Sequence, residues 1–179
     1  MALFQYMVLI GYPPNKISIL TTYNGQKDLL QDILSQRCGE GTPFAGMRPK
    51  AVSTVDQYQG QQNDYCILSL VRTQSVGHLR DIRRLVVAVS RARLGLYVLG
   101  RQSLFAGCHE LKRTMDQFDE RPNKLQLVLG EHYPTERKLT DKIPKKDLFE
   151  VEDVAHLGAM VHKMQESWIA PEAMDESTG

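Results

Sequence analysis

The chain has 179 residues, of which 42% are hydrophobic and 24% charged, and its formal net charge is +1. These values fit one compact domain and give no global electrostatic reason to bind nucleic acid, so any polyanion site must be a local patch. No apolar run reaches the roughly 18 residues that a membrane span needs, and the start of the chain lacks the basic region and cleavage site of a secretory signal. Three scattered cysteines without a CxxC pair are typical of reduced packing thiols in an intracellular protein.

The first part of the chain alternates predicted helices and strands. Its apolar start predicts a helix over residues 1–10, which ends at Gly11 and the prolines that follow. The β-branched run KISILTTY predicts a buried strand, and residues 24–38 place leucines and isoleucine at helical spacing. A loop rich in glycine and proline then leads to AVSTV, which predicts a second strand.

The same alternation continues further along. DYCILSLV predicts a third strand, and Asp81 is a suitable N-cap for the helix that follows it. LGLYVLG and KLQLVL predict a fourth and a fifth strand, with a helical stretch between them. Apolar strands alternating with helices predict an α/β fold, in which a parallel sheet carries helices on both faces.

The composition changes at about Glu131, where the chain becomes polar and rich in proline and lysine. We therefore expect a domain over residues 1–130 and a C-terminal extension over 131–170, with a helix at about 152–168. Residues 171–179 are expected to be disordered. The apolar residues of the helix recur three and four apart, and packing on the domain or on a neighbour is the simplest expectation.

The segment RRLVVAVSRARLG carries an unusual concentration of arginine. Six arginines lie between residues 71 and 93, against one acid. A helix over 80–91 would bury a stripe of apolar residues and place Arg84 and Arg91 together on the opposite face, with Ala88 between them. The use of arginine without lysine suits bidentate contact between guanidinium groups and phosphate or carboxylate. Pairing of these arginines with acids elsewhere on the surface is an alternative. The expected buried stripe consists of Ile82, Leu85, Val86 and Val89.

Three segments resemble motifs of one known family. TVDQYQGQQNDYCILSLVR resembles motif V of the superfamily 1 helicases, in the branch that includes the nonsense-mediated-decay helicase. RRLVVAVSRARLGLYVLG resembles motif VI and ISILTTYNGQKDLL resembles motif IV, and the resemblance covers residues 1–129 in the family's order. Within this branch, GQQNDY and VGHLRDIRRLVVA most resemble the intron-binding helicase of the spliceosome.

The resemblance implies that the chain is the second of two RecA-like lobes, between which ATP binds with Mg²⁺, while single-stranded RNA runs across both. It implies spliceosomal partners, an intron as the RNA, and a nuclear location. By position, Arg91 matches the catalytic arginine finger that reaches the γ-phosphate. The nucleotide-binding positions are Gly60, Gln62, Arg84 and Arg91, and the RNA-binding positions are Thr22, Tyr23, Thr54 and Arg72.

The sequence departs from the family pattern in two ways. Gln62 stands where the family usually has an acid. Its amide can keep the hydrogen bond to the nucleotide but lacks the negative charge of a carboxylate. No G-x-x-x-x-G-K-[ST] segment and no DExx-type acidic pair occur. We therefore expect the first lobe to be absent and this chain alone to be inactive as an ATP hydrolase.

The sequence also allows a second function and argues against a metal site. A catalytically inert lobe that binds RNA or a protein partner is an alternative to half of an ATP-dependent RNA helicase. No metal site is expected, because the histidines lack ligand spacing and Asp56 and Asp64 fit a turn acid and a strand-start acid better than a metal pair.

Overall fold

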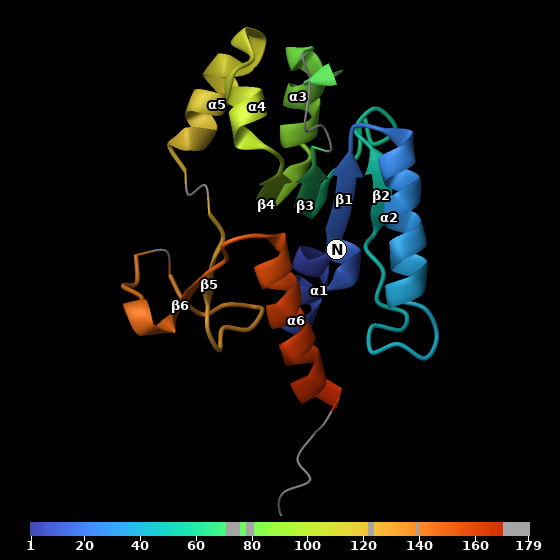
Figure 1. Cartoon of the computed structure of the whole chain (residues 1–179), viewed down its shortest axis with the longest axis vertical. Coiled ribbons are helices and arrows are strands. Elements are labelled where there is room, and N and C mark those ends of the chain that lie inside the picture. The colour runs from blue at the N-terminus through green and yellow to red at the C-terminus, as the bar shows by residue number, and fades with distance from the viewer. Residues whose placement is uncertain (71–75, 78–80, 122–123, 139, 170–179) are drawn as a thin grey trace, which may run out of the picture.

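The computed structural model describes residues 1–70, 76–77, 81–121, 124–138 and 140–169. A four-stranded sheet lies in the middle of the molecule and helices pack against it, while a small two-stranded sheet lies to one side (Figure 1). Within the described part of the chain, no helix is both long and apolar enough to cross a membrane.

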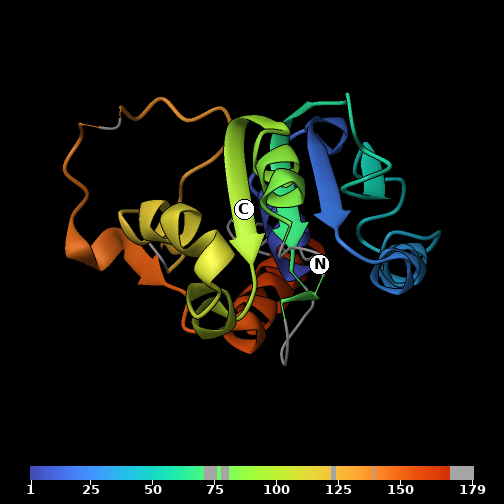
Figure 2. The ribbon, with the colours of Figure 1, turned by 90° about the horizontal axis from the view of Figure 1, so that it is seen from above.

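The main sheet is entirely parallel. It consists of β1 (Ile17–Thr21), β2 (Ala51–Thr54), β3 (Asn63–Ser69) and β4 (Ala92–Leu99), in the order β2-β1-β3-β4. Seen from above, the strands run in one direction with helices on either side (Figure 2). The α/β fold expected from the alternation of elements is thereby confirmed.

Two hydrophobic clusters cover the two faces of this sheet. Side chains alternate along a strand, so Ile19 of β1 contributes to one cluster and Leu20 to the other. All five residues of β1 are buried, as expected for a strand covered on both faces. The first cluster includes α1 (Ala2–Leu9), α2 (Asn24–Arg37) and α6 (Val154–Ile169); the second includes α3 (Ile82–Val89), α4 (Gln102–Ala106), the 3-10 turn η3 (His109–Leu111) and α5 (Lys112–Asp119).

Helix α3 begins as predicted, because the Asp81 carboxylate accepts a hydrogen bond from the Arg83 backbone N–H at 3.0 Å. Its buried face, however, is rotated from the expected stripe. Leu85 and Ala88 are buried, whereas Ile82 and Val86 are 38% and 52% exposed. The small side chain of Ala88 allows the helix to approach the sheet closely on that side.

This rotation changes where the arginines lie. Arg84 and Arg91 share a side of the segment, but they border the buried face and are themselves partly buried, so the expectation that they lie opposite it is wrong. The helix also ends at Val89, and Arg91 precedes the first residue of β4.

The expected fifth strand does not join the main sheet. β5 (Gln126–Val128) pairs in antiparallel fashion with β6 (Leu148–Glu150) in a separate two-stranded sheet. The apolar run alone predicts that a strand forms, but its periodicity does not say with which strand it pairs. Short 3-10 turns precede β1 and β6, namely η1 (Pro14–Lys16) and η4 (Lys145–Asp147).

The C-terminal helix packs on the domain. Leu157 and Val161 of α6 are buried in the same cluster as Phe4 of α1. The sequence expectation of a helix near residues 152–168 agrees with α6, and residues 171–179 lie outside the described part. The division of the chain at residue 130 stays a prediction.

We expect Leu157→Ala to lower the free energy of unfolding by about 2–5 kcal/mol, because it removes a buried side chain and leaves a cavity. Leu157 is 4% exposed, whereas Val154 in the first turn of the same helix is 67% exposed. Val154→Ala should therefore change stability by no more than about 0.5 kcal/mol. Urea unfolding followed by circular dichroism measures both; equal effects would contradict the packing of α6 in the core.

Candidate functional site

The loop between β2 and β3 is held against the sheet by one aromatic side chain. Tyr58 is 1% exposed, and its hydroxyl hydrogen-bonds with Ser18 Oγ of β1 at 3.0 Å. On either side of Tyr58 the loop is exposed, at residues 56–57 and 59–62. The buried tyrosine thus fixes the position of a polar turn that solvent and ligands can reach.

Asn63, the first residue of β3, extends this buried network. Its Nδ2 donates to Ser18 Oγ at 2.9 Å and to the Asn15 carbonyl at 3.3 Å. Its Oδ1 accepts from the Asp64 backbone N–H at 2.9 Å. Sequence reasoning missed Ser18, Tyr58 and Asn63, and the only signal was an aromatic residue and an amide inside a polar run.

Gly60 occupies the left-handed region of the backbone, with φ of +79°. A Cβ built there would meet no atom within 4 Å, so the glycine is required by the turn and not by crowding. The open space above Gly60 and the exposure of Gln62 leave this turn free for close approach by a ligand.

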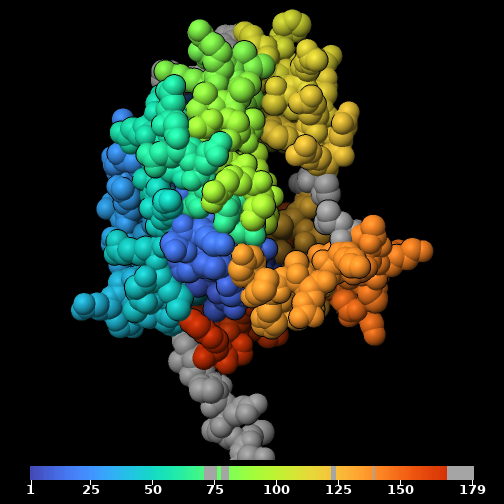
Figure 3. Space-filling view, turned by 180° about the vertical axis from the view of Figure 1, so that it is seen from behind, coloured from blue at the N-terminus to red at the C-terminus, as the bar shows by residue number. Residues whose placement is uncertain are grey.

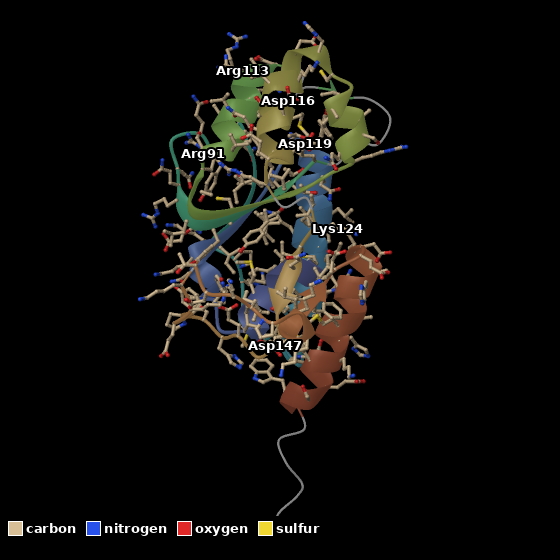
Figure 4. The ribbon with its side chains drawn as sticks, turned by 90° about the vertical axis from the view of Figure 1, so that its left-hand side faces the viewer. Arg91, Arg113, Asp116, Asp119, Lys124 and Asp147 are labelled. Atoms are coloured by element: carbon tan, nitrogen blue, oxygen red, sulfur yellow. The ribbon has the colours of Figure 1, made fainter. Side chains whose placement is uncertain are left out.

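The Arg91 guanidinium lies against the same turn. Its Nη1 donates to the Gln61 carbonyl at 3.2 Å, its Nε to the Val87 carbonyl at 2.8 Å and its Nη2 to Ser90 Oγ at 2.8 Å. Arg91 lies where α3 ends and β4 begins (Figure 4), and the surfaces of the β2–β3 loop, α3 and β4 adjoin on the rear face of the molecule (Figure 3). The structure therefore places Arg91 against Gln61, which lies between the predicted residues Gly60 and Gln62.

The other described arginines of the segment pair with acids. Arg83 Nε lies 3.1 Å from Asp81 Oδ1, Arg84 Nη1 lies 3.5 Å from Asp56 Oδ2, and Arg93 Nη2 lies 2.6 Å from Asp64 Oδ1. The alternative of acid pairing thus holds for these three. In the described part of the chain, no carboxylate lies within ion-pair distance of Arg91, so its charge is met by neutral oxygens alone.

Arg84 lies near the turn through its contact with Asp56, one of the two partners left open by the sequence. Both side chains are substantially exposed, so the pair contributes little to stability. Asp64 instead contacts Arg93 and, at 3.5 Å, Lys16 Nζ. The residues that the structure describes contain no group of three or more metal-ligating side chains.

The predicted RNA-binding residues lie at the carboxyl edge of the sheet. Thr21 of β1 is level with Thr54 of β2, and Thr22 and Tyr23 follow directly. Thr54 Oγ1 accepts from the Gln57 backbone N–H at 3.3 Å. Among the described residues, the buried hydroxyls of Thr21 and Thr22 have no hydrogen-bond partner. Arg72, the fourth predicted residue, lies outside the described residues.

Helix α2 begins beside these threonines. Its N-cap is Tyr23, which makes no side-chain capping hydrogen bond, and a Cβ at Gly25 would meet no atom within 4 Å. The N-terminus of a helix presents backbone N–H groups and a partial positive charge, which together favour an anion. The threonine hydroxyls are buried, so the groups that this edge offers to a phosphate backbone are the backbone amides at the start of α2, which carry no information about base identity.

The chain belongs to the AAA domain family, which matches residues 1–103. A parallel α/β domain with a glycine turn and an adjacent arginine is in keeping with that assignment. The chain is 53% identical over 163 residues to RNA helicase aquarius of Mus musculus, covering 91% of this chain and 11% of that protein.

Two further relatives point in the same direction. The chain is 33% identical over 164 residues to pre-mRNA-splicing factor cwf11 of Schizosaccharomyces pombe, covering 91% of this chain and 12% of that protein. It is 38% identical over 100 residues to regulator of nonsense transcripts 1 of Dictyostelium discoideum, covering 54% of this chain and 7% of that protein. The resemblance to superfamily 1 helicases of the nonsense-mediated-decay branch is confirmed, and the chain spans only about a tenth of these relatives.

All three cysteines are free and buried, as expected for packing thiols. Cys66 of β3 packs in the same cluster as Leu85 and Ala88 of α3, and Asn63 and Arg91 both act on its thiol. Burial raises the pKa of the Cys66 thiol to about 11, although the Asn63 backbone and the Arg91 charge act in the opposite direction. The thiol therefore stays protonated at neutral pH.

We expect the chain to lose stability as pH rises from about 9 to about 11. The raised pKa of Cys66 means that the unfolded state releases this proton first, so the contribution is complete below pH 9 and is lost as pH passes through the folded value of about 11. Urea midpoints at pH 8 and pH 10.5 measure the loss. Cys66→Ala should lose less between these pH values than the parent, and an equal loss in both would contradict the assignment.

Proposed function

We propose that this chain is the C-terminal RecA-like lobe of an ATP-dependent RNA helicase and that Arg91 is its arginine finger. The observation that carries the proposal is the Arg91 guanidinium, which is held beside the Gly60 turn by neutral acceptors only. Its positive charge therefore remains available to a phosphate. The relatives, an RNA helicase and a splicing factor among them, support the assignment.

The donors of Arg91 fit a phosphate contact. A guanidinium has five N–H groups, and three of them are engaged. One N–H on each terminal nitrogen remains to donate to phosphate oxygens, and the planar guanidinium suits such contacts better than an ammonium group does. A finger of this kind stabilises the charge that develops on the transferred phosphoryl group.

The other nucleotide-facing residues have supporting roles. The exposed turn at Gly60 allows close backbone approach, and the Gln62 amide can hydrogen-bond a ribose or base without adding charge. Arg84 adds positive charge near the turn, although Asp56 compensates part of it. ATP and Mg²⁺ would bind only with the first lobe, because this sequence has no P-loop to hold phosphates and metal.

RNA would lie along the carboxyl edge of the sheet. Thr22, Tyr23 and Thr54 lie there, next to the N-terminus of α2. The backbone amides at the start of α2 would contact phosphates and position the strand without reading its sequence. Arg72 is assigned to the same surface from the sequence alone.

The cellular role follows from the relatives. We assign the parent helicase to pre-mRNA splicing in the nucleus, with single-stranded intron RNA and spliceosomal proteins as partners. The similarity to RNA helicase aquarius and to pre-mRNA-splicing factor cwf11 over 91% of this chain supports this assignment.

We expect the purified chain to release phosphate from ATP no faster than buffer does, since it carries the finger without the P-loop. Grafted in place of the matched segment of RNA helicase aquarius, it should support turnover. In that chimera Arg91→Ala should lower kcat by roughly 10³–10⁵-fold, because the transition-state charge loses its main donor.

Arg83→Ala is the matched control, because Arg83 is on the same segment but pairs with Asp81 on the exposed surface. It should leave kcat within about twofold. Turnover by the isolated chain that Arg91→Ala abolishes would contradict the proposal. An inactive chimera from an active parent would favour the inert binding lobe.

We also expect the isolated chain to bind single-stranded RNA weakly and with a shallow salt dependence. Contacts with two to four phosphates predict a slope of log Kobs against log[salt] of about −1.4 to −2.8, at roughly 0.7 per phosphate. Fluorescence anisotropy with a labelled oligouridine between low and moderate salt measures it. A much steeper slope would indicate an extended, independent RNA site.

A further inference from the structure

We infer that Ser90 is a positioning residue for Arg91, in that its hydroxyl sets the plane of the guanidinium that faces the nucleotide. This inference rests on the proposed function of Arg91. Ser90 follows the last residue of α3, and its backbone N–H donates to the Val86 carbonyl at 3.1 Å, so its own place at the helix end is well defined.

The Ser90 hydroxyl makes two contacts with opposite roles. It donates to the Val87 carbonyl at 3.1 Å and accepts from Arg91 Nη2 at 2.8 Å. Donation to Val87 orients the hydroxyl, so that its lone pairs point towards the guanidinium. The Val87 carbonyl also accepts from Arg91 Nε at 2.8 Å, which closes a small ring of hydrogen bonds between the two side chains and one carbonyl.

Three acceptors thus hold three different nitrogens of the guanidinium. Val87 holds Nε, Ser90 holds Nη2 and the Gln61 carbonyl holds Nη1. Three non-collinear contacts define a plane, whereas two leave the group free to rotate about the line that joins them. The backbone supplies two of the acceptors, and Ser90 supplies the one that a substitution can remove.

The neutrality of the hydroxyl is as important as its position. A carboxylate at the same distance would form a charge-assisted bond and neutralise the guanidinium, as Asp81, Asp56 and Asp64 do for other arginines of this segment. A hydroxyl holds the group and leaves its charge for the phosphate. Ser90 is exposed, so its side chain has no packing role that would account for the arrangement.

A purely structural alternative is that Ser90 only caps the end of α3. The two roles differ in what they change: capping affects stability, whereas positioning affects the rate of the chemical step. Misplacement of a catalytic group by about 1 Å can cost on the order of 100-fold in rate. The steady-state rate must therefore be measured together with stability and with the Michaelis constant for ATP.

The test uses the chimera with RNA helicase aquarius and three variants. Ser90→Ala should lower kcat about tenfold, with KM for ATP and RNA affinity within about twofold, since a hydrogen bond to a charged group is lost without removal of the finger. Ser90→Thr keeps the hydroxyl and should stay within about threefold of the parent. Ser90→Asp should lower kcat by 100-fold or more, because its carboxylate neutralises Arg91.

A second readout needs only the isolated chain. In ¹⁵N NMR spectra, the Nη2 hydrogens of Arg91 should exchange slowly with solvent in the parent and in Ser90→Thr, and several-fold faster in Ser90→Ala, because Ser90 accepts from Nη2. The thermal midpoint of Ser90→Ala should change little, because Ser90 is exposed.

The outcomes separate the inference from the function on which it rests. If Arg91→Ala keeps full turnover, the finger assignment fails and with it the inference. If Arg91→Ala loses turnover while Ser90→Ala stays within twofold, the inference alone is overturned, whatever Ser90→Asp does. A loss in Ser90→Ala that matches its loss of folded protein would assign Ser90 to capping and would likewise overturn it.

Discussion

The buried hydrogen bond between Tyr58 and Ser18 is the constraint on which the rest of the site depends. At 3.0 Å it ties the loop between β2 and β3 to the most deeply buried strand of the sheet, and Asn63 joins the same network. A buried hydroxyl pair that lost one partner would leave the other unsatisfied, so the network favours a single loop position. Gly60 and Gln61 are thereby placed where Arg91 reaches them.

The same loop runs from the carboxyl edge of the main sheet to its amino edge. Thr54 lies at the carboxyl end of β2, beside Thr21, while Gln62 directly precedes the amino end of β3. A displacement of Tyr58 would therefore move both the residues beside the threonines and the residues that contact Arg91. Because packed interiors deform little, a loop anchored in the middle transmits movement between its ends better than an unanchored one.

Electrostatics divides the arginines into two groups. Arg83, Arg84 and Arg93 each have a carboxylate partner, which compensates the charge of the guanidinium. Arg91 is held by neutral oxygens, which orient the guanidinium at no cost to its charge. This difference in partners gives Arg91 its place in the proposed function, and composition alone could not have separated it from its neighbours.

The sequence by itself determined the α/β alternation, the N-cap at Asp81 and the resemblance through motifs IV, V and VI, because periodicity and local turn chemistry are properties of short segments. Only the tertiary structure decided that β5 leaves the main sheet, that Ala88 and not Val86 faces it, and that α6 packs on α1. It alone revealed Ser18, Tyr58 and Ser90 around the site. These outcomes depend on which surfaces compete for burial and on hydrogen bonds between residues far apart in the chain, and neither is encoded in the spacing of one segment.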